Sequence, residues 1–232
     1  MRNKVILTIG VLSIKIKQNS SKYIKMKKRN LILVRHGQSE WNAKNLFTGW
    51  KDPDLTNLGL NEASNAGALI KETQIEFDEM FTSNLGRAQR TGAIILDLLA
   101  QTNILITKNE ALNERNYGSL AGLNKDDARK KWGEEQVHIW RRSFDIPPPD
   151  GESLKNTAER VLPYFNQQIM PKIIDGNNIL IAAHGNSLRA LIMQLDGISQ
   201  EDIVNLEIPT GAPIHYSFNN DGSIIKKDNL YE

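Results

Sequence analysis

Short apolar runs alternate with longer segments of mixed polarity from Asn30 to the end of the chain. The pattern predicts strands at residues 31–34, 79–82, 104–107 and 178–183. Apolar positions at helical spacing predict helices from a cap at Thr56 to about Lys71, and over residues 86–99, 153–169 and 187–195. Pro163 is expected to kink or break the third of these helices, because proline removes a backbone donor.

Alternating strands and helices are typical of an α/β protein. We therefore predict three layers, a mostly parallel central sheet with helices on both faces, and a ligand site beyond the carboxyl ends of the strands. Residues 214–218 and 224–227, joined by a turn at 219–222, predict a hairpin at a sheet edge. The chain has 232 residues and is 40% apolar, so we expect residues 29–232 to form a single domain.

Charge divides the chain unevenly. The first 29 residues hold nine Lys and Arg and no acid, whereas the rest holds 20 basic and 27 acidic residues. Residues 1–28 are therefore expected to be a basic extension, either a disordered tail or an upstream start before Met26. A transit peptide is the alternative, while the apolar stretch 5–12 is too short to span a bilayer. Because the body is acidic, we expect neither nucleic acid nor a membrane as a partner.

Cysteine is absent, which excludes disulfides and thiolate zinc sites, and no metal is expected. Two histidines directly follow predicted strands, in Arg35-His36-Gly37 and in His184-Gly185-Asn186. A histidine at a rigid strand end can attack phosphorus, and a neighbouring arginine can neutralise phosphate oxygens. Gly37 is expected to let the backbone approach the anion closely. The alternative for His36 is a structural histidine buried at a strand end.

Two further motifs suit the same chemistry. Arg87 lies at a predicted helix start, where backbone N–H groups also favour an anion, although a solvated surface arginine is the simpler interpretation. Glu114 is followed by Arg115 and Tyr117, so the acid could exchange protons with a substrate hydroxyl while its neighbours hold an anion. A surface ion pair is the alternative for this segment.

Together these residues resemble a known family, the cofactor-dependent phosphoglycerate mutases of the histidine phosphatase superfamily, in a short bacterial-type form. The resemblance extends from Asn30 to about Tyr216. Arg-His-Gly alone is typical of the whole superfamily, whereas the segment 47–50, Asn124-Lys125 and Arg141-Arg142 are similar to the mutases in particular.

The resemblance implies interconversion of 3-phosphoglycerate and 2-phosphoglycerate, in glycolysis and gluconeogenesis, by a cytoplasmic isomerase. It implies His36 as the phosphorylated nucleophile, Glu114 as proton donor and acceptor, and His184 as a stabiliser of the transferring group. The implied cofactor is 2,3-bisphosphoglycerate, which primes the phosphohistidine, and the implied assembly is a homodimer or homotetramer. The residues implied in substrate binding are Arg35, His36, Gly37, Gln38, Ser39, Glu40, Trp41, Asn42, Thr48, Gly49, Arg87, Glu114, Arg115, Asn116, Tyr117, Lys125, Arg141, Arg142, Gly185 and Asn186.

The chain departs from the longer mutases in two places. Asp150 directly follows the Pro147-Pro148-Pro149 run where those mutases have an insertion, and the chain ends at Glu232 without their mobile tail. Both features weaken the exclusion of water, which a mutase needs and a phosphatase does not. We expect a compact mutase. A phosphatase that uses His36 and Glu114 is the alternative within enzymes, and a module that only binds a phosphorylated ligand is the alternative outside them.

Overall fold

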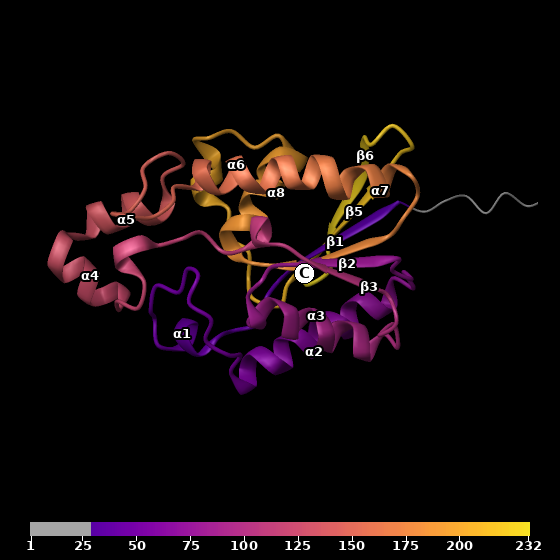
Figure 1. Cartoon of the computed structure of the whole chain (residues 1–232), viewed down its shortest axis with the longest axis horizontal. Helices are drawn as coiled ribbons and strands as arrows, with labels where there is room; N and C mark the ends of the chain where they lie inside the picture. The colour runs from indigo at the N-terminus through magenta and orange to yellow at the C-terminus, as the bar shows by residue number, and fades with distance from the viewer. Residues whose placement is uncertain (1–28) are drawn as a thin grey trace, which may run out of the picture.

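Six strands form one sheet in the computed structural model, which describes residues 29–232 (Figure 1). Their order in the sheet is β3-β2-β4-β1-β5-β6. The first four are mutually parallel, and β5 runs antiparallel to both of its neighbours. The predicted mostly parallel sheet is confirmed, while the predicted extension at residues 1–28 lies outside the described residues. The strands are β1 (Asn30–Arg35), β2 (Glu79–Thr82), β3 (Leu105–Lys108), β4 (Ile179–Ala183), β5 (Pro213–Phe218) and β6 (Ile224–Asn229).

Helices cover both faces of the sheet, as predicted (Figure 1). Successive side chains of a strand point to opposite faces, so β1 supplies both cores. Leu31 and Leu33 pack with α6 (Leu154–Tyr164) and α8 (Gly185–Asp196). Ile32 and Val34 pack with α2 (Asn57–Glu72) and α3 (Gly86–Leu98). All four β1 side chains are fully buried, and each contributes roughly 1.5–3 kcal/mol of hydrophobic stabilisation.

Most predicted boundaries lie within two residues of the observed ones. Thr56 caps α2 as predicted, and its side chain accepts a hydrogen bond from the N–H of Gly59. The predicted helix at 153–169 is interrupted, because α6 ends at Tyr164 and is followed by the π-helical η3 (Phe165–Ile169) and by α7 (Met170–Ile174). Pro163 lacks the N–H that an α-helix would use at that point. The buried apolar face nevertheless continues through η3 into α7.

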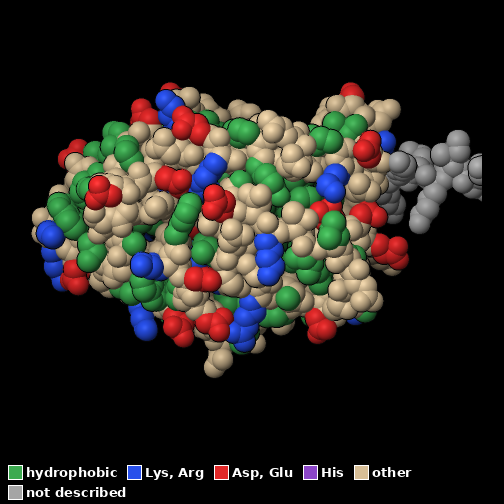
Figure 2. Space-filling model, viewed as in Figure 1, with side chains coloured by type: hydrophobic (Ala, Val, Ile, Leu, Met, Phe, Trp, Pro, Cys, Tyr) green, Lys and Arg blue, Asp and Glu red, His purple; other side chains and the backbone are tan. Residues whose placement is uncertain are grey.

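The hairpin of β5 and β6 lies at one edge of the sheet, as predicted. Its turn places Gly222 at φ +84°, a conformation that suits glycine. The other edge is β3. On the face seen in Figure 2, charged side chains of both signs are interspersed with apolar ones. No helix in residues 29–232 is long and apolar enough to cross a membrane.

A small lobe lies beyond the end of the sheet and was not predicted (Figure 1). It contains α4 (Lys125–Trp132) and α5 (Glu134–Arg142), whose buried Ala128 and Val137 pack with Phe47 and Leu120. Trp132 and Trp140 meet edge to face, with ring centroids 5.7 Å apart. The remaining short elements are α1 (Glu40–Ala43), η1 (Glu110–Leu112), η2 (Gly118–Leu120) and η4 (Asp202–Asn205).

Candidate active site

Neighbouring parallel strands bring the two predicted histidines together. Arg35 at the end of β1 pairs with Ala183 at the end of β4, and the N–H of His36 donates to the carbonyl of Ala183 at 2.9 Å. The residues that follow β1 and β4 therefore lie side by side, at the carboxyl ends of these parallel strands. The rings of His36 and His184 meet edge to face, with centroids 5.0 Å apart and an interplanar angle of 60°. Both side chains are buried.

The surroundings of His36 fix its tautomer. Its Nδ1 lies 2.7 Å from the carbonyl oxygen of Gly37, which can only accept, so Nδ1 carries the hydrogen. Nε2 is left with a lone pair, and the Nε of Arg87 donates to it at 3.3 Å. Burial lowers the pKa of His36 well below its usual value, and the charges of Arg87 and Arg35 lower the pKa further. The imidazole is thus neutral at neutral pH, with its Nε2 lone pair facing Arg87.

Gly37 has a different role from the one expected. A Cβ on Gly37 would lie 2.1 Å from the carbonyl oxygen of Gly59, in the first turn of α2. A Cβ on Gly59 would lie 2.1 Å from the carbonyl oxygen of Gln38. The side of Gly37 without a side chain therefore faces α2 rather than an anion. Glycine is needed at both positions so that the loop after β1 can pack against the helix.

His184 is held by a residue that the sequence did not single out. Ser83, directly after β2, places its Oγ 2.7 Å from the Nε2 of His184. Burial lowers the pKa of His184 well below its usual value, and the charge of Arg87 contributes in the same direction. His184 is therefore a neutral imidazole beside His36.

Arg87 is buried, so the interpretation as a solvated surface arginine is wrong. It lies in the first turn of α3. Its Nη1 donates to the carbonyl oxygen of Lys51 at 2.7 Å, and its Nη2 donates to that of Gly49 at 2.9 Å. Asp52 is its carboxylate partner at 3.4 Å. These contacts hold the guanidinium in place with its Nε directed at His36.

Glu114 is 8% exposed, so the surface ion pair is also excluded. Its Oε1 accepts hydrogen bonds from the N–H of Arg115 at 2.8 Å and from the backbone and side-chain nitrogens of Asn186, both at 3.0 Å. The Arg115 guanidinium turns away and donates to the hydroxyl of Tyr117 and the carbonyl of Arg141. Within the described part of the chain, Oε2 of Glu114 has no hydrogen-bond partner and lies beside Gly185.

His36, Arg87 and Glu114 line a pocket of about 130 Å³ between the ends of the strands and the small lobe, whereas His184 packs against His36 without lining the pocket. Burial lowers the pKa of Lys125 and of Arg141, which the lobe contributes. Burial raises the pKa of Tyr117, but the charges of Arg115 and Arg141 and the hydrogen bond from Arg115 together outweigh burial, so the net shift of the pKa is downward. Among residues 29–232, Arg35 Nε and Thr48 Oγ1 are buried and find no hydrogen-bond partner, as expected of groups that bind an anion. Twelve of the residues implied by the resemblance line the pocket: Arg35, His36, Asn42, Thr48, Arg87, Glu114, Tyr117, Lys125, Arg141, Arg142, Gly185 and Asn186.

The other eight lie around the pocket without lining it. Ser39 caps α1 and donates to the Asn42 side chain, and Gln38 accepts from the Thr56 hydroxyl. Gly49 and Arg115 hold lining residues, through the contacts to Arg87 and Arg141 described above. The remaining four are Gly37, Glu40, which is exposed, Trp41, which is half-buried beside Gly122, and Asn116, whose N–H donates to Glu152.

The pocket also contains residues that the sequence interpretation missed. Arg189 lies one turn after Asn186 in α8, and its Nη1 donates to Asn186 Oδ1 at 3.2 Å. Burial lowers the pKa of Arg189 to about 10. Helical spacing from Asn186 was a signal that could have found it. Phe47 belongs to the segment 47–50 that the resemblance singled out, whereas no local signal marks the other missed residues, which are Leu46, Glu207 and Ile208.

The chain matches the profile of the histidine phosphatase superfamily (branch 1) over residues 31–230. It is 63% identical over 202 residues to a 2,3-bisphosphoglycerate-dependent phosphoglycerate mutase of Parvibaculum lavamentivorans, across 87% of this chain and 96% of that protein. The chain belongs to the 2,3-bisphosphoglycerate-dependent phosphoglycerate mutases. A mutase of the same name from Nitrobacter hamburgensis is 60% identical over 205 residues, across 88% of this chain and 99% of that protein.

The fold is shared with more distant members of the superfamily. The crystal structure of a phosphoglycerate mutase from Bacillus anthracis superposes with a TM-score of 0.69 at 21% identity, over 88% of this chain and 92% of that one. The aligned 202 and 205 residues span 96% and 99% of the two mutase relatives, so these relatives are no longer than this chain. No cluster of three or more metal-ligating side chains occurs within residues 29–232.

Proposed function

We propose that the protein interconverts 3-phosphoglycerate and 2-phosphoglycerate through a phosphohistidine at His36, primed by 2,3-bisphosphoglycerate. The relatives that support this are named as 2,3-bisphosphoglycerate-dependent phosphoglycerate mutases. One observation carries the assignment of the nucleophile: the neutral His36 ring has its Nδ1 hydrogen held by a carbonyl and its Nε2 lone pair beside Arg87.

The proposed cycle transfers one phosphoryl group in each direction. The Nε2 lone pair attacks phosphorus of the bisphosphate, the ester P–O bond breaks, and Glu114 gives its proton to the departing glycerate oxygen. In the reverse step a substrate hydroxyl loses its proton to Glu114 and attacks the phosphohistidine. Reorientation of the bisphosphate between the two steps exchanges the 2- and 3-positions. The unpartnered Oε2 of Glu114 is the oxygen that would carry this proton.

The transferring group spreads negative charge over three equatorial oxygens in the transition state. Arg35, Arg87 and His184 are assigned to these oxygens, together with the Asn42 side chain and the Gly185 N–H. Fixed donors in a buried pocket stabilise such charge more than mobile water does, because they need no reorganisation during the reaction.

The carboxylate and the non-reacting phosphate of the substrate are assigned to the side of the pocket formed by the small lobe. Lys125, Arg141 and Arg142 present three cations there. A simple phosphatase has less need of such a second anion site. The assignment extends to Arg115, Tyr117 and Asn186, with Ser39, Thr48 and Gly49 nearby.

We place this activity in the cytoplasm, because the phosphoglycerates are intermediates of glycolysis and gluconeogenesis. A homodimer or homotetramer is proposed as the assembly. The edge strand β3 supports it, since Leu105 is 61% exposed and Ile106 is 38% exposed on the outermost strand of the described sheet. Light scattering on the purified protein and on Leu105→Lys tests this, and a monomeric wild type contradicts it.

The function is tested by a coupled assay that converts 3-phosphoglycerate to phosphoenolpyruvate through added enolase, with free phosphate followed in parallel. We expect stimulation by catalytic 2,3-bisphosphoglycerate, little phosphate release, and no activity in His36→Ala. Phosphate release without isomerisation would make the protein a phosphatase whose short loop after Pro149 admits water. Tight binding without either reaction would make it a binding module.

A further inference from the structure

Glu114 lies in a buried segment without regular secondary structure. Residues 113–116 fall between η1 and η2, and Asn113, Glu114 and Arg115 are all buried. Backbone groups of such a segment lack the partners that a helix or sheet would supply, so other groups must bind them. The position of the Glu114 carboxylate depends on these other groups.

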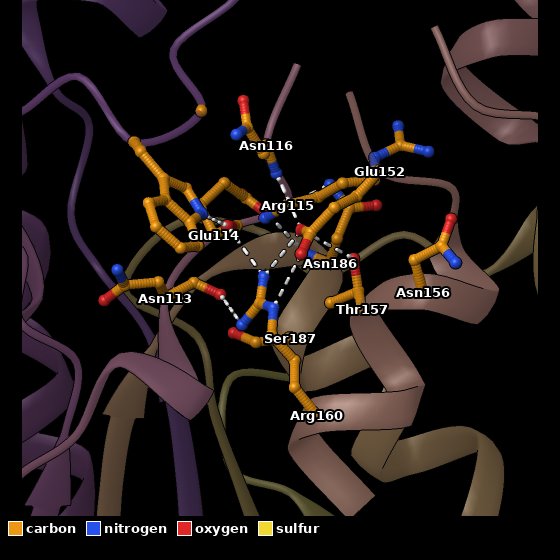
Figure 3. Close-up of polar contacts among 12 residues, drawn as sticks. Asn113, Glu114, Arg115, Asn116, Glu152, Asn156, Thr157, Arg160, Asn186 and Ser187 are labelled. Atoms are coloured by element: carbon orange, nitrogen blue, oxygen red, sulfur yellow. Dashed lines mark hydrogen bonds and ion pairs between the residues drawn. The ribbon is translucent and has the colours of Figure 1, made fainter. Parts of the chain in front are cut away.

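One guanidinium binds the carbonyls of this segment. Arg160 of α6 extends from its helix into the loop that carries Glu114 (Figure 3). Its Nη1 donates to the carbonyl oxygens of Ala111 at 2.8 Å and Asn113 at 3.0 Å, and its Nη2 donates to that of Glu114 at 3.0 Å. The indole N–H of Trp50 donates to the same Glu114 carbonyl at 2.6 Å.

One carboxylate binds the other side of the segment. Glu152 accepts from the N–H of Asn116 at 2.9 Å and from Arg160 at 2.9 Å and 2.8 Å, one bond to each of its oxygens (Figure 3). Burial raises the pKa of Glu152, but the hydrogen bonds from Arg160 and Asn116 and the charge of Arg160 together outweigh burial, so the net shift of the pKa is downward and the carboxylate is ionised. The ion pair therefore holds a carbonyl of Glu114 and the N–H two residues later as one unit.

Neither member of the pair lines the pocket, so neither contacts substrate in the site described above. We propose that Arg160 and Glu152 are positioning residues that hold Glu114 with Oε2 directed at the substrate oxygen. This inference rests on the proposed function, which gives Glu114 the proton. The planar fork of arginine matters because its donors reach Glu152 and several carbonyls at once, whereas a lysine ammonium has no such geometry.

The test compares Arg160→Lys, Glu152→Gln and the double variant with wild type. Phosphorylation of His36 by labelled 2,3-bisphosphoglycerate is followed by rapid quench, so that the amplitude counts competent sites and the rate reports the transfer. We expect wild-type amplitude with a transfer rate and kcat about 10- to 100-fold lower, and a KM within about threefold of wild type. Because the two residues act as a unit, the double variant should be no slower than the slower single variant.

Arg90→Lys is the matched control, since Arg90 makes an exposed ion pair with Asp54 and should leave every parameter unchanged. An unchanged rate in Arg160→Lys and Glu152→Gln overturns the inference. A fall in kcat explained wholly by a lower amplitude also overturns it, because the pair would then only maintain the fold. A wild type that forms no phosphohistidine instead contradicts the proposed function itself, before any variant is compared.

Discussion

The Nε of Arg87 donates to the Nε2 of His36 at 3.3 Å, so a buried cation faces the nitrogen proposed as nucleophile. This contact opposes protonation of the imidazole, because a second positive charge would lie beside the guanidinium. It also places the cation where a phosphoryl group on Nε2 would need it. One contact thus keeps the nucleophile neutral and prepares the site for an anion.

The first prediction concerns the pH dependence of His36 phosphorylation. Burial, Arg87 and Arg35 all lower the pKa of His36, so the reactive neutral form should persist below pH 6.5. Arg87→Gln removes one of these charges, raises the pKa, and should move the acid limb of the rate profile to higher pH. Arg90→Gln, on an exposed position of the same helix, is the control. An acid limb that stays in place in Arg87→Gln contradicts the proposed effect, whatever the height of the plateau.

The second prediction concerns stability in acid. His36 and His184 are neutral in the folded protein because burial lowers the pKa of each, whereas both bind protons near pH 6.5 when unfolded. The unfolded state therefore binds more protons below pH 6.5, and the free energy of unfolding should fall as pH falls. The limiting slope is about 1.4 kcal/mol per pH unit for each histidine.

Urea unfolding between pH 7 and pH 5 measures this slope. The double variant His36→Gln and His184→Gln should show a clearly shallower dependence than wild type. The same substitution at the exposed His138 is the matched control for loss of an imidazole. Equal slopes in wild type and the double variant would show that the two histidines do not set the acid sensitivity.

The third prediction concerns the packing of the loop after β1 on α2. A Cβ on Gly37 or Gly59 would lie 2.1 Å from a backbone oxygen, so alanine at either position must displace the backbone. Each substitution should lower the free energy of unfolding by about 3 kcal/mol and slow His36 phosphorylation. Gly67→Ala in the same helix is the control. Its Cβ would lie 3.3 Å from the Leu98 side chain rather than 2.1 Å from a backbone oxygen, and alanine favours the helix, so this substitution should lower the free energy of unfolding far less. Denaturant titration separates these cases, and a stable Gly37→Ala contradicts the argument.

The positions of His36 and His184 at strand ends could be predicted, because the short apolar runs before them are typical of buried strands. Parallel pairing of β1 and β4 then brings His36 and His184 together. The role of Gly37 could not be predicted in the same way, since it depends on contact with Gly59 more than 20 residues later. The residues next to Gly37 in the sequence do not indicate that its backbone will contact Gly59.

The small lobe was missed for a related reason. The segments of α4 and α5 contain few apolar residues, and only Ala128 and Val137 are buried in them. Their helices pack against Phe47 and Leu120, which come from other parts of the chain. The Arg160 and Glu152 pair was missed because its partners are backbone groups, which no sequence motif displays.

The last prediction concerns an acid at the edge of a cationic pocket. Glu207 lines the pocket and forms an ion pair with Arg142, which joins the lobe to the segment before β5. A substrate anion must compete with this carboxylate for the arginine. Glu207 is mostly exposed, so the ion pair is worth at most about 1 kcal/mol. Glu207→Gln should therefore lower the KM for 3-phosphoglycerate by about two- to fivefold and leave kcat unchanged.

Steady-state assays at two salt concentrations measure this effect, and the difference in KM should shrink at the higher salt because exposed charges are screened. Glu201→Gln removes an exposed acid that does not line the pocket and should leave KM unchanged. A higher KM in Glu207→Gln would show the opposite role, in which Glu207 holds Arg142 in the orientation that binds substrate. The two roles change KM in opposite directions. The KM values of wild type and Glu207→Gln therefore decide whether Glu207 competes with substrate for Arg142 or holds Arg142 in place for it.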